Sequence, residues 1–427
     1  LDLYDENYHR PPITSTGLHA LFTGCTELQT LSVNIHDEIK LMPSSFFRLS
    51  SLTDANLNFG LSDFPDEFGG LKSLKKLTLE EMYIGNLSES FGLLTALTEL
   101  NFSTCKELYD LPDSIGDLCS LKKLTIFHAE SLEVLPDQLG RLHNLEEVQF
   151  LFNESLCQLP LPFFRLPKLR ILNLWELGDL PELEGDVSNL VALETLSIDK
   201  CRFTSPPASL CKLPNLRCLK VTDCMALNHL PRSIGSLPSL QRLELSNLRN
   251  VKRLPGTISK LSSLRSFSLK RCNGITTLPA SLFQNCGLLT DIEFDWPSSC
   301  VDGKQAGKLS PAEAFLSSLC RMSSLAVLAL SGFPRISTLS QQIGNLSQLK
   351  QLKLSSWPNL AGLPDSMSKL TSLESLVISL CPAFKDKAAA ILELPNVRVS
   401  LSCNHWEPEE EEWGSEDEEG EEEDGLM

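Results

Sequence analysis

Leucine recurs through this chain of 427 residues at a nearly constant interval. The leucines that open successive LxxLxL blocks, from Leu28 to Leu373, lie 22 to 25 residues apart with one exception. A coil of that length cannot bury its own leucines, so neighbouring coils must stack and bury one another's. The interval therefore predicts an elongated stack of similar coils.

One unit shows how each coil is built. In LPDSIGDLCSLKKLTI, residues 111–126, the side chains of Leu121, Leu124 and Ile126 alternate along an extended strand and point inward. Gly116 permits a tight turn on the outer side. The motif LxxLxLxx(N/C)xL, repeated every 22 to 25 residues, is the signature of leucine-rich repeats. We therefore predict an α/β fold, a horseshoe-shaped solenoid of about 15–16 repeats with a parallel β-sheet on its concave face.

The two ends of the chain differ. Leu1 and Leu3 already follow the strand pattern, which is typical of a fragment cut from a longer chain. We expect the solenoid to cover residues 1–405, with a C-terminal cap at about 384–403. Residues 406–427 bury too little apolar surface to fold, so we expect an acidic disordered tail.

One repeat is longer than the others. Leu289 and Leu325 are 36 residues apart, which indicates an insertion at about residues 297–318. Ser310 is a good N-cap, and Glu313 follows three residues later, as a capping box requires. A short outer helix is therefore expected after Ser310.

The net charge of −18 comes mostly from the end of the chain. Residues 407–427 hold thirteen Asp and Glu and no Lys or Arg, and the remainder has 42 acidic and 37 basic residues. A nearly balanced body argues against nucleic acid as a partner. No apolar run is long enough to span a membrane, and no signal peptide opens the chain, so we expect a cytoplasmic or nuclear protein.

The cysteines follow the repeat rather than a disulfide framework. Five share one slot just after the strand with Asn153: Cys105, Cys201, Cys224, Cys272 and Cys381. A thiol there is a small buried group able to face the backbone of the neighbouring coil. We expect structural free thiols and a reducing compartment.

Motifs for chemistry are missing from the sequence. It contains no HExxH, GxSxG, CxxC or His-Cys cluster with zinc spacing, and VDGKQAGK lacks the spacing of a phosphate-binding loop. We therefore expect no enzyme activity, no cofactor and no metal.

An apolar column on the concave face is the first candidate binding site. Phe127, Leu151 and Trp175 are spaced by 24 residues at a strand position that is polar in most coils, and His128 and Phe152 adjoin them. An apolar column on a polar surface is the usual mark of a partner site, although loops folding over it would instead make it structural.

A second candidate surface carries mixed charge. It consists of cations from several coils, edged by two residues that lead into the insertion: Lys220, Arg242, Lys270 and Arg271, with Asp295 and Trp296. These cations would receive an acidic patch of a partner or the acidic tail of this chain, unless they are simply a solvated face.

The repeats LPDSIGDLCSLKKLTI, LPRSIGSLPSLQRLEL and LPDSMSKLTSLESLVISLC are similar to those of plant intracellular nucleotide-binding leucine-rich-repeat (NLR) resistance receptors. The resemblance covers nearly all of residues 1–403. It implies that the solenoid does no chemistry, restrains an adjacent nucleotide-binding switch domain, and senses a pathogen effector or a modified host protein. No switch domain is present in this sequence.

The resemblance leaves another class of protein open. This class is the stand-alone intracellular signalling scaffold, like the plant repeat proteins that are related to Ras-binding ones. Such a scaffold shares the LPxxIGxLxxL motif and does not need a switch domain. An acidic histone- or phosphatase-binding repeat protein would explain the tail, but such proteins have few repeats. The sequence upstream of Leu1 would separate the first two classes, because a phosphate-binding loop there indicates a receptor.

Overall fold

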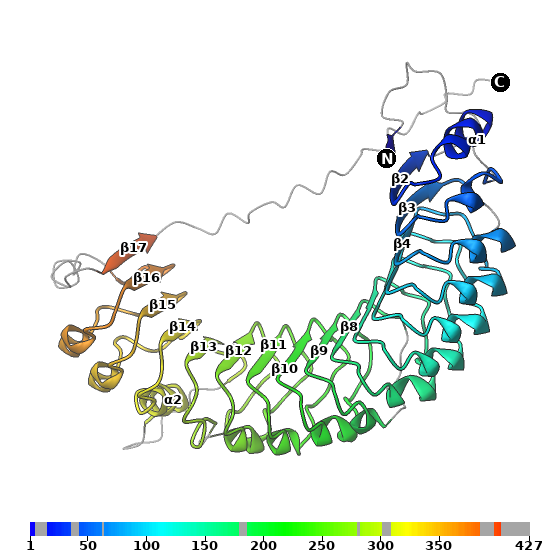
Figure 1. The fold of residues 1–427 in the computed structure, drawn as a ribbon. Helices are drawn as coiled ribbons and strands as arrows, with labels where there is room; N and C mark the ends of the chain where they lie inside the picture. Colours follow the sequence, from blue (N-terminus) through cyan, green and yellow to red (C-terminus); the bar gives the residue numbers. More distant parts are fainter. Residues whose placement is uncertain are drawn as a thin grey trace, which may run out of the picture.

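The computed structural model of the chain is a single curved stack of coils, with the sheet on the inner, concave side and short helices on the outer side (Figure 1). It describes residues 1–4, 15–35, 42–61, 64–178, 186–279, 282–300, 309–384 and 397–402. Residues 301–308 of the expected insertion, most of the expected cap and the acidic tail lie outside these ranges.

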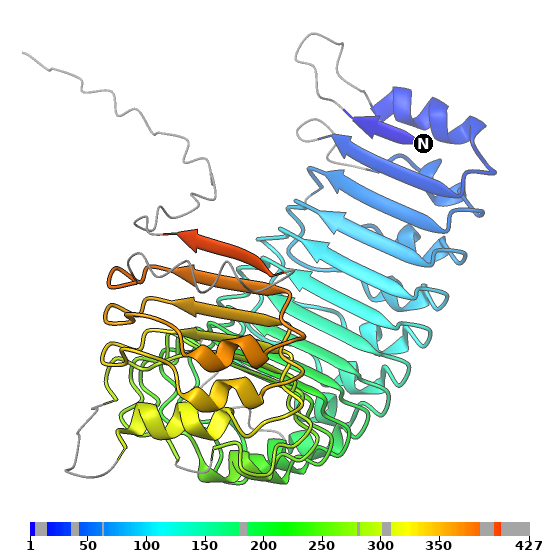
Figure 2. The ribbon, with the colours of Figure 1, turned by 90° about the vertical axis from the view of Figure 1, so that its left-hand side faces the viewer.

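All strands in the described residues belong to one 17-stranded sheet, in which each strand pairs in parallel with the next along the chain (Figure 2). This confirms the predicted solenoid, with one or two strands beyond the 15–16 repeats expected. The strands are β1 Asp2–Tyr4, β2 Thr30–Ile35, β3 Asp54–Phe59, β4 Lys76–Glu80, β5 Glu99–Ser103, β6 Lys123–Phe127, β7 Glu147–Leu151, β8 Ile171–Trp175, β9 Thr195–Asp199, β10 Cys218–Thr222, β11 Arg242–Ser246, β12 Ser266–Lys270, β13 Asp291–Asp295, β14 Val327–Ser331, β15 Gln351–Ser355, β16 Ser375–Ser379 and β17 Arg398–Ser402.

Helical segments cover the convex side of the sheet. The α-helices are α1 Ser15–Gly24 and α2 Pro311–Leu319. The 3-10 helices are η1 Phe46–Arg48, η2 Asp66–Gly70, η3 Glu89–Leu93, η4 Asp113–Asp117, η5 Asp137–Arg141, η6 Leu161–Arg165, η7 Val187–Asn189, η8 Ala208–Lys212, η9 Ile234–Ser236, η10 Gly256–Lys260, η11 Gln341–Asn345 and η12 Asp365–Lys369. In α2 the predicted capping box is present: Glu313 N donates to Ser310 Oγ at 3.2 Å, and Ser310 N donates to Glu313 Oε2 at 2.8 Å.

The core runs between the sheet and the outer helices. Leu121, Leu124 and Ile126 are fully buried, as predicted, and so is Ile115 of η4. In the last strand, Leu401 pairs with Ile378 but remains 46% exposed, because no coil follows it in the described part of the chain. Burial of apolar surface between coils is the dominant stabilising term in such a stack.

The slot after each strand ties neighbouring coils together. Asn153 Nδ2 donates to the carbonyl of Ile126 at 2.8 Å, and Asn153 Oδ1 accepts from the backbone N–H of Ala129 at 2.9 Å. Cys105 Sγ donates likewise to the Leu79 carbonyl, at 3.4 Å. The thirteen cysteines that the structure describes are all free thiols, and burial raises the pKa of Cys105 to about 11 and of Cys201 to about 12.

Candidate functional site

The apolar column predicted from the sequence is present on the concave face. Phe127, Leu151 and Trp175 are each the last residue of their strand, and the register of β6, β7 and β8 places them side by side. Phe152 joins them: its ring centroid lies 4.6 Å from that of Trp175 and 5.5 Å from that of Phe127. We call Phe127, Leu151, Phe152 and Trp175 the aromatic ridge.

The ridge is accessible among the residues that the structure describes. Trp175 is 38% exposed, and Phe127, Leu151 and Phe152 are half-buried. Offset and edge-to-face ring contacts of this kind hold the side chains in place and leave one side open. Loops among the described residues therefore do not bury the column. Residues 179–185 lie outside the part of the chain that the structure describes.

The residues that follow β6 and β7 have a left-handed backbone conformation, which sets the direction of their side chains beside the ridge. His128 and Phe152 have φ of 57° and 56°, and residues at the same place in other coils do the same. The backbone N–H of Phe152 donates to the Trp175 carbonyl at 2.8 Å, and that of His128 donates to the Leu151 carbonyl at 2.9 Å. A left-handed conformation costs a non-glycine residue roughly 1–2 kcal/mol, so these bonds to the next coil must hold it. The Phe152 ring is thereby fixed at the edge of the sheet.

Charged neighbours that the sequence analysis missed complete the ridge. Lys200 Nζ lies 5.8 Å from the ring centroid of Phe152 and 5.9 Å from that of Trp175, and it pairs with Glu176 at 3.0 Å. Phe152, Glu176 and Lys200 occupy one repeat position at intervals of 24 residues, so the period could have revealed them. Burial raises the pKa of Asp199, which lies opposite Trp175 in the register. An aromatic surface rimmed by paired charges suits a partner side chain with an apolar body and a polar end.

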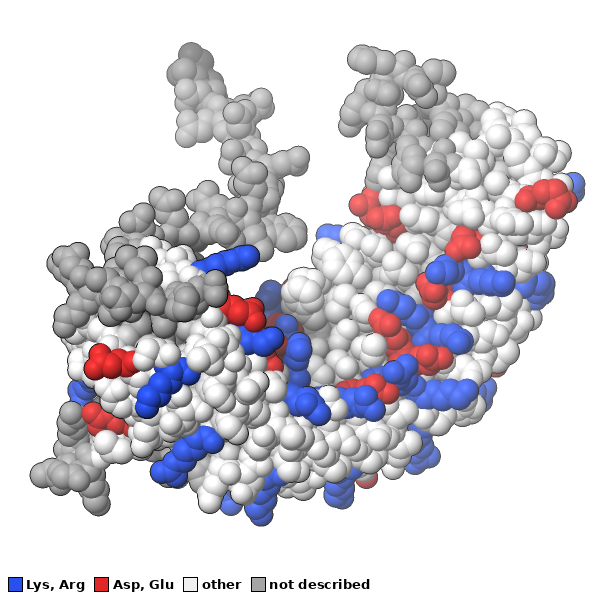
Figure 3. Space-filling model, turned by 60° about the vertical axis from the view of Figure 1, so that its left-hand side comes forward, with Lys and Arg blue, Asp and Glu red and all other residues white. Residues whose placement is uncertain are grey.

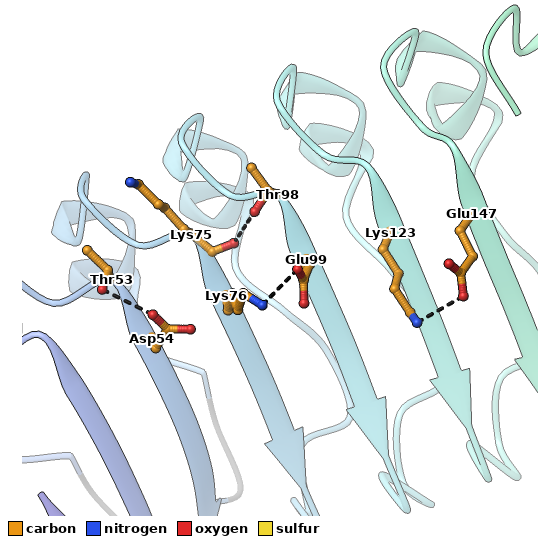
Figure 4. Close-up of polar contacts among 8 residues, drawn as sticks. All are labelled: Thr53, Asp54, Lys75, Lys76, Thr98, Glu99, Lys123 and Glu147. Atoms are coloured by element: carbon orange, nitrogen blue, oxygen red, sulfur yellow. Dashed lines mark hydrogen bonds and ion pairs between the residues drawn. The ribbon is translucent and has the colours of Figure 1, made fainter.

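The strands of the N-terminal half begin with a ladder of alternating charge (Figure 4). Lys76 Nζ lies 2.9 Å from Glu99 Oε1, and Lys123 Nζ lies 2.9 Å from Glu147 Oε1. The hydrogen bond and the charge of Glu99 raise the pKa of Lys76. These exposed pairs stabilise the fold little, but they leave this edge without a strong net charge. Figure 3 shows the same interleaving of positive and negative side chains over this part of the hollow.

An uncharged polar column lies between the ladder and the ridge. The third residue of every strand from β2 to β9 is Ser, Thr, Asn or Gln: Ser32, Asn56, Thr78, Asn101, Thr125, Gln149, Asn173 and Ser197. The column and the ladder line a hollow of about 470 Å³ over β2 to β7. Amide and hydroxyl groups both donate and accept hydrogen bonds, so this column can pair with peptide groups of a partner.

The second candidate surface does not form one patch. Arg242 is the first residue of its strand, Lys220 the third and Lys270 the fifth, so they stand in three separate columns. Lys220 faces Glu244 at 3.8 Å and Lys270 pairs with Glu293 at 2.9 Å. Arg271 remains exposed at a left-handed turn, and its N–H donates to Asp295 at 3.1 Å. Burial raises the pKa of Asp295.

The expectation that Trp296 edges this surface is wrong. Trp296 is only 4% exposed, and its ring packs 5.0 Å from that of Phe333 and 6.0 Å from that of Phe315. It continues the inward alternation that begins with Ile292 and Phe294, and the insertion helix α2 supplies Phe315 to cover it. Trp296 is a core residue.

The residues that the structure describes contain no group of three or more His, Cys, Asp and Glu that could hold a metal ion. None of the helices among them is long and apolar enough to cross a bilayer.

A curved parallel sheet, leucines buried between coils and a recurring slot of bridging polar groups define a leucine-rich repeat solenoid. Residues 55–160 and 162–293, more than half of the chain, match the family model described as a leucine-rich repeat region. The chain belongs to this family. No curated protein sequence matches the chain.

Solved structures share the fold at low sequence identity. A leucine-rich repeat protein of Leptospira interrogans has a TM-score of 0.70 and 23% identity, over 94% of this chain and 95% of that one. A glycosylated form of the Drosophila Toll–Spätzle complex has a TM-score of 0.58 and 19% identity over 84% of this chain, which spans about half (51%) of that chain. At such identities the likeness concerns the fold alone.

Proposed function

We propose that this chain is a protein-binding module that engages a partner protein through the N-terminal half of its concave face, with the aromatic ridge as anchor. The observation that carries this proposal is the contiguous, accessible set of Phe127, Phe152 and Trp175 on a concave face whose other exposed side chains are mostly polar. Interface hot spots are enriched in Trp, and they cluster in apolar centres with polar surroundings. The ladder and the uncharged column supply such surroundings.

The biological setting that we propose is a plant immune receptor. The wording LPxSIGxLxSLxxLxLxxC is similar to that of plant intracellular NLR receptors. In that setting the partner is a pathogen effector or a host protein, and the solenoid also contacts the receptor's nucleotide-binding domain to restrain it. The free thiols support a reducing, cytoplasmic or nuclear location. We propose neither nucleic acid nor membrane as a partner.

A stand-alone signalling scaffold is the second candidate. It is favoured by the fact that nothing in the described solenoid requires a switch domain, since the coils bury one another. The receptor and the scaffold differ in whether the solenoid contacts a nucleotide-binding domain of its own chain. Both use the proposed surface for a partner protein.

Replacing both Phe152 and Trp175 with Ala tests the proposal. Proximity labelling with the parent chain identifies a partner, and calorimetry then measures its Kd for each variant. Because a hot-spot residue contributes about 2 kcal/mol or more, we expect the Kd to rise at least tenfold while the melting temperature stays close to that of the parent.

The matched control is Leu161→Ala, which removes a side chain that is 62% exposed on η6, on the convex side. We expect this variant to bind like the parent. A double mutant that loses thermal stability but keeps its Kd would show that the ridge is structural.

A further inference from the structure

Lys and Arg are concentrated in one sector of the solenoid. Residues 200–271 contain fourteen Lys and Arg against two acidic residues, Asp223 and Glu244. They build the coils of β10, β11 and β12. Figure 3 shows Lys and Arg with little Asp or Glu along the lower edge of the molecule, where these coils lie in Figure 1. The solenoid as a whole has nearly equal numbers of acidic and basic residues, but this sector is strongly basic.

Most of these cations have no carboxylate partner. Lys200, Lys220 and Lys270 lie in ion pairs, and Arg202 also has a partner. The other ten form no ion pair with a residue that the structure describes. A surface with so many uncompensated positive charges attracts an anionic segment.

The side of these coils that follows the strands carries four such cations. Arg249, Lys252 and Arg253 follow β11, Arg271 follows β12, and all four are exposed. We call these four residues the basic flank. The backbone beneath is fixed by the next coil, because Thr276 N donates to the Lys252 carbonyl at 3.0 Å.

The segments that follow β10, β11 and β12 carry no negative charge, since residues 224–231, 248–255 and 272–279 contain no Asp or Glu. Asp223 and Asp295 are the carboxylates at the strand ends beside the basic flank, and both already accept hydrogen bonds, from Asn247 and from the N–H of Arg271. The corresponding side of the N-terminal coils is acidic, since residues 105–110 and 129–134 hold four carboxylates and one Lys. An anionic segment on this side of the molecule would therefore be attracted to the basic flank and repelled by the N-terminal coils.

The chain itself supplies such a segment. Residues 407–424 hold thirteen Asp and Glu and no Lys or Arg. Because β17 is parallel to the other strands, the chain leaves Ser402 at the edge of the sheet where the strands end, which is the edge of the basic flank. From β17 to β12 is five strand spacings, about 24 Å, which about seven extended residues can cross. The first carboxylates can therefore reach Arg271.

We propose that the acidic segment 407–424 binds the basic flank of its own chain. A short tether holds the segment at an effective concentration of the order of millimolar, so many weak surface ion pairs together suffice. Surface charges are screened within about 8 Å at physiological ionic strength, so the docked state weakens as salt rises. An anionic partner from outside must displace the segment to reach the basic flank.

Zero-length carbodiimide cross-linking of the full chain tests the proposal, because it joins carboxylates to lysine amines in contact. At 0.05 M salt we expect the dominant cross-link from residues 407–424 to end on Lys252. Both 0.5 M salt and the variant Arg249→Glu/Arg253→Glu should reduce this cross-link at least fivefold. The matched control Arg217→Glu/Arg265→Glu makes the same charge change in neighbouring coils, at the edge where the strands begin, and should leave it unchanged.

Three results would overturn the proposal. The first is an even spread of cross-links over surface lysines such as Lys72 and Lys122. The second is a cross-link that persists in Arg249→Glu/Arg253→Glu when the melting temperature of that variant matches that of the parent. The third is loss of the cross-link in the parent on addition of a stoichiometric amount of a twenty-nucleotide oligothymidine, which would assign the basic flank to nucleic acid.

Discussion

At the scale of single residues, different side chains in the slot after each strand make the same hydrogen bond to the backbone of the preceding coil. Asn153 bridges two backbone groups of the preceding coil. The thiols of Cys201 and Cys272 donate to the equivalent carbonyls, at 3.7 and 3.8 Å. Trp357 Nε1 donates to the Leu330 carbonyl at 3.2 Å. A buried polar group of the backbone is thus paired in each case, which explains why the slot accepts cysteine without any disulfide.

Asn153→Ala should destabilise the solenoid by about 1–3 kcal/mol, because it leaves the buried N–H of Ala129 without its acceptor. Asn153→Cys should lose less, since the thiol can restore the bond to the Ile126 carbonyl. Urea unfolding of both variants measures the difference. Equal stability of Asn153→Ala and the parent would show that the bridge contributes nothing.

At the scale of an element, the outer 3-10 helices depend on glycine for close approach rather than for a turn. A Cβ on Gly116 would lie 2.5 Å from the Gln138 carbonyl oxygen of the next coil. Gly92 and Gly140 face the same constraint from Ser114 and Pro162. These glycines therefore set the spacing of the coils on the convex side. The tight turn expected at Gly116 is present as η4, but the glycine is required there for close approach of the next coil.

Gly116→Ala should destabilise the fold by about 1–3 kcal/mol, because the coils must move apart to relieve the overlap. Gly256→Ala is the matched control: Gly256 also lies in a 3-10 helix, η10, and nothing lies within 4 Å of its Cβ position. That variant should be neutral or more stable by about 0.5–1 kcal/mol. Thermal unfolding of the pair distinguishes close approach from a general intolerance of alanine.

Elements of the repeat were predictable from the sequence because one pattern fixes them all. The strands, the buried leucines and the capping box of α2 follow from local spacing. The helix α1 was not foreseen, since its coil departs from the repeat wording. The burial of Trp296 could not be foreseen either, because it depends on Phe315, which reaches it from a helix across the insertion.

At the scale of the whole molecule, function depends on columns that cross many coils. The aromatic ridge was predictable because its residues recur at 24-residue intervals. The same period relates Glu176 and Lys200 to Phe152, but their contact with the rings needed the structure, because the left-handed turn decides which side chains reach the rings. The charge ladder likewise depends on strand register, which sets Lys76 against Glu99. A curved sheet thus collects single residues of separate coils into one surface large enough for a protein partner.

The central claim is that a partner protein binds over β6, β7 and β8. Hydrogen–deuterium exchange of the chain with and without its bound partner tests it most directly. We predict that binding slows exchange in residues 123–128, 147–152 and 171–176 and leaves the outer helices η4, η5 and η6 unchanged. Protection confined to the outer helices, with none in these three segments, would contradict the account.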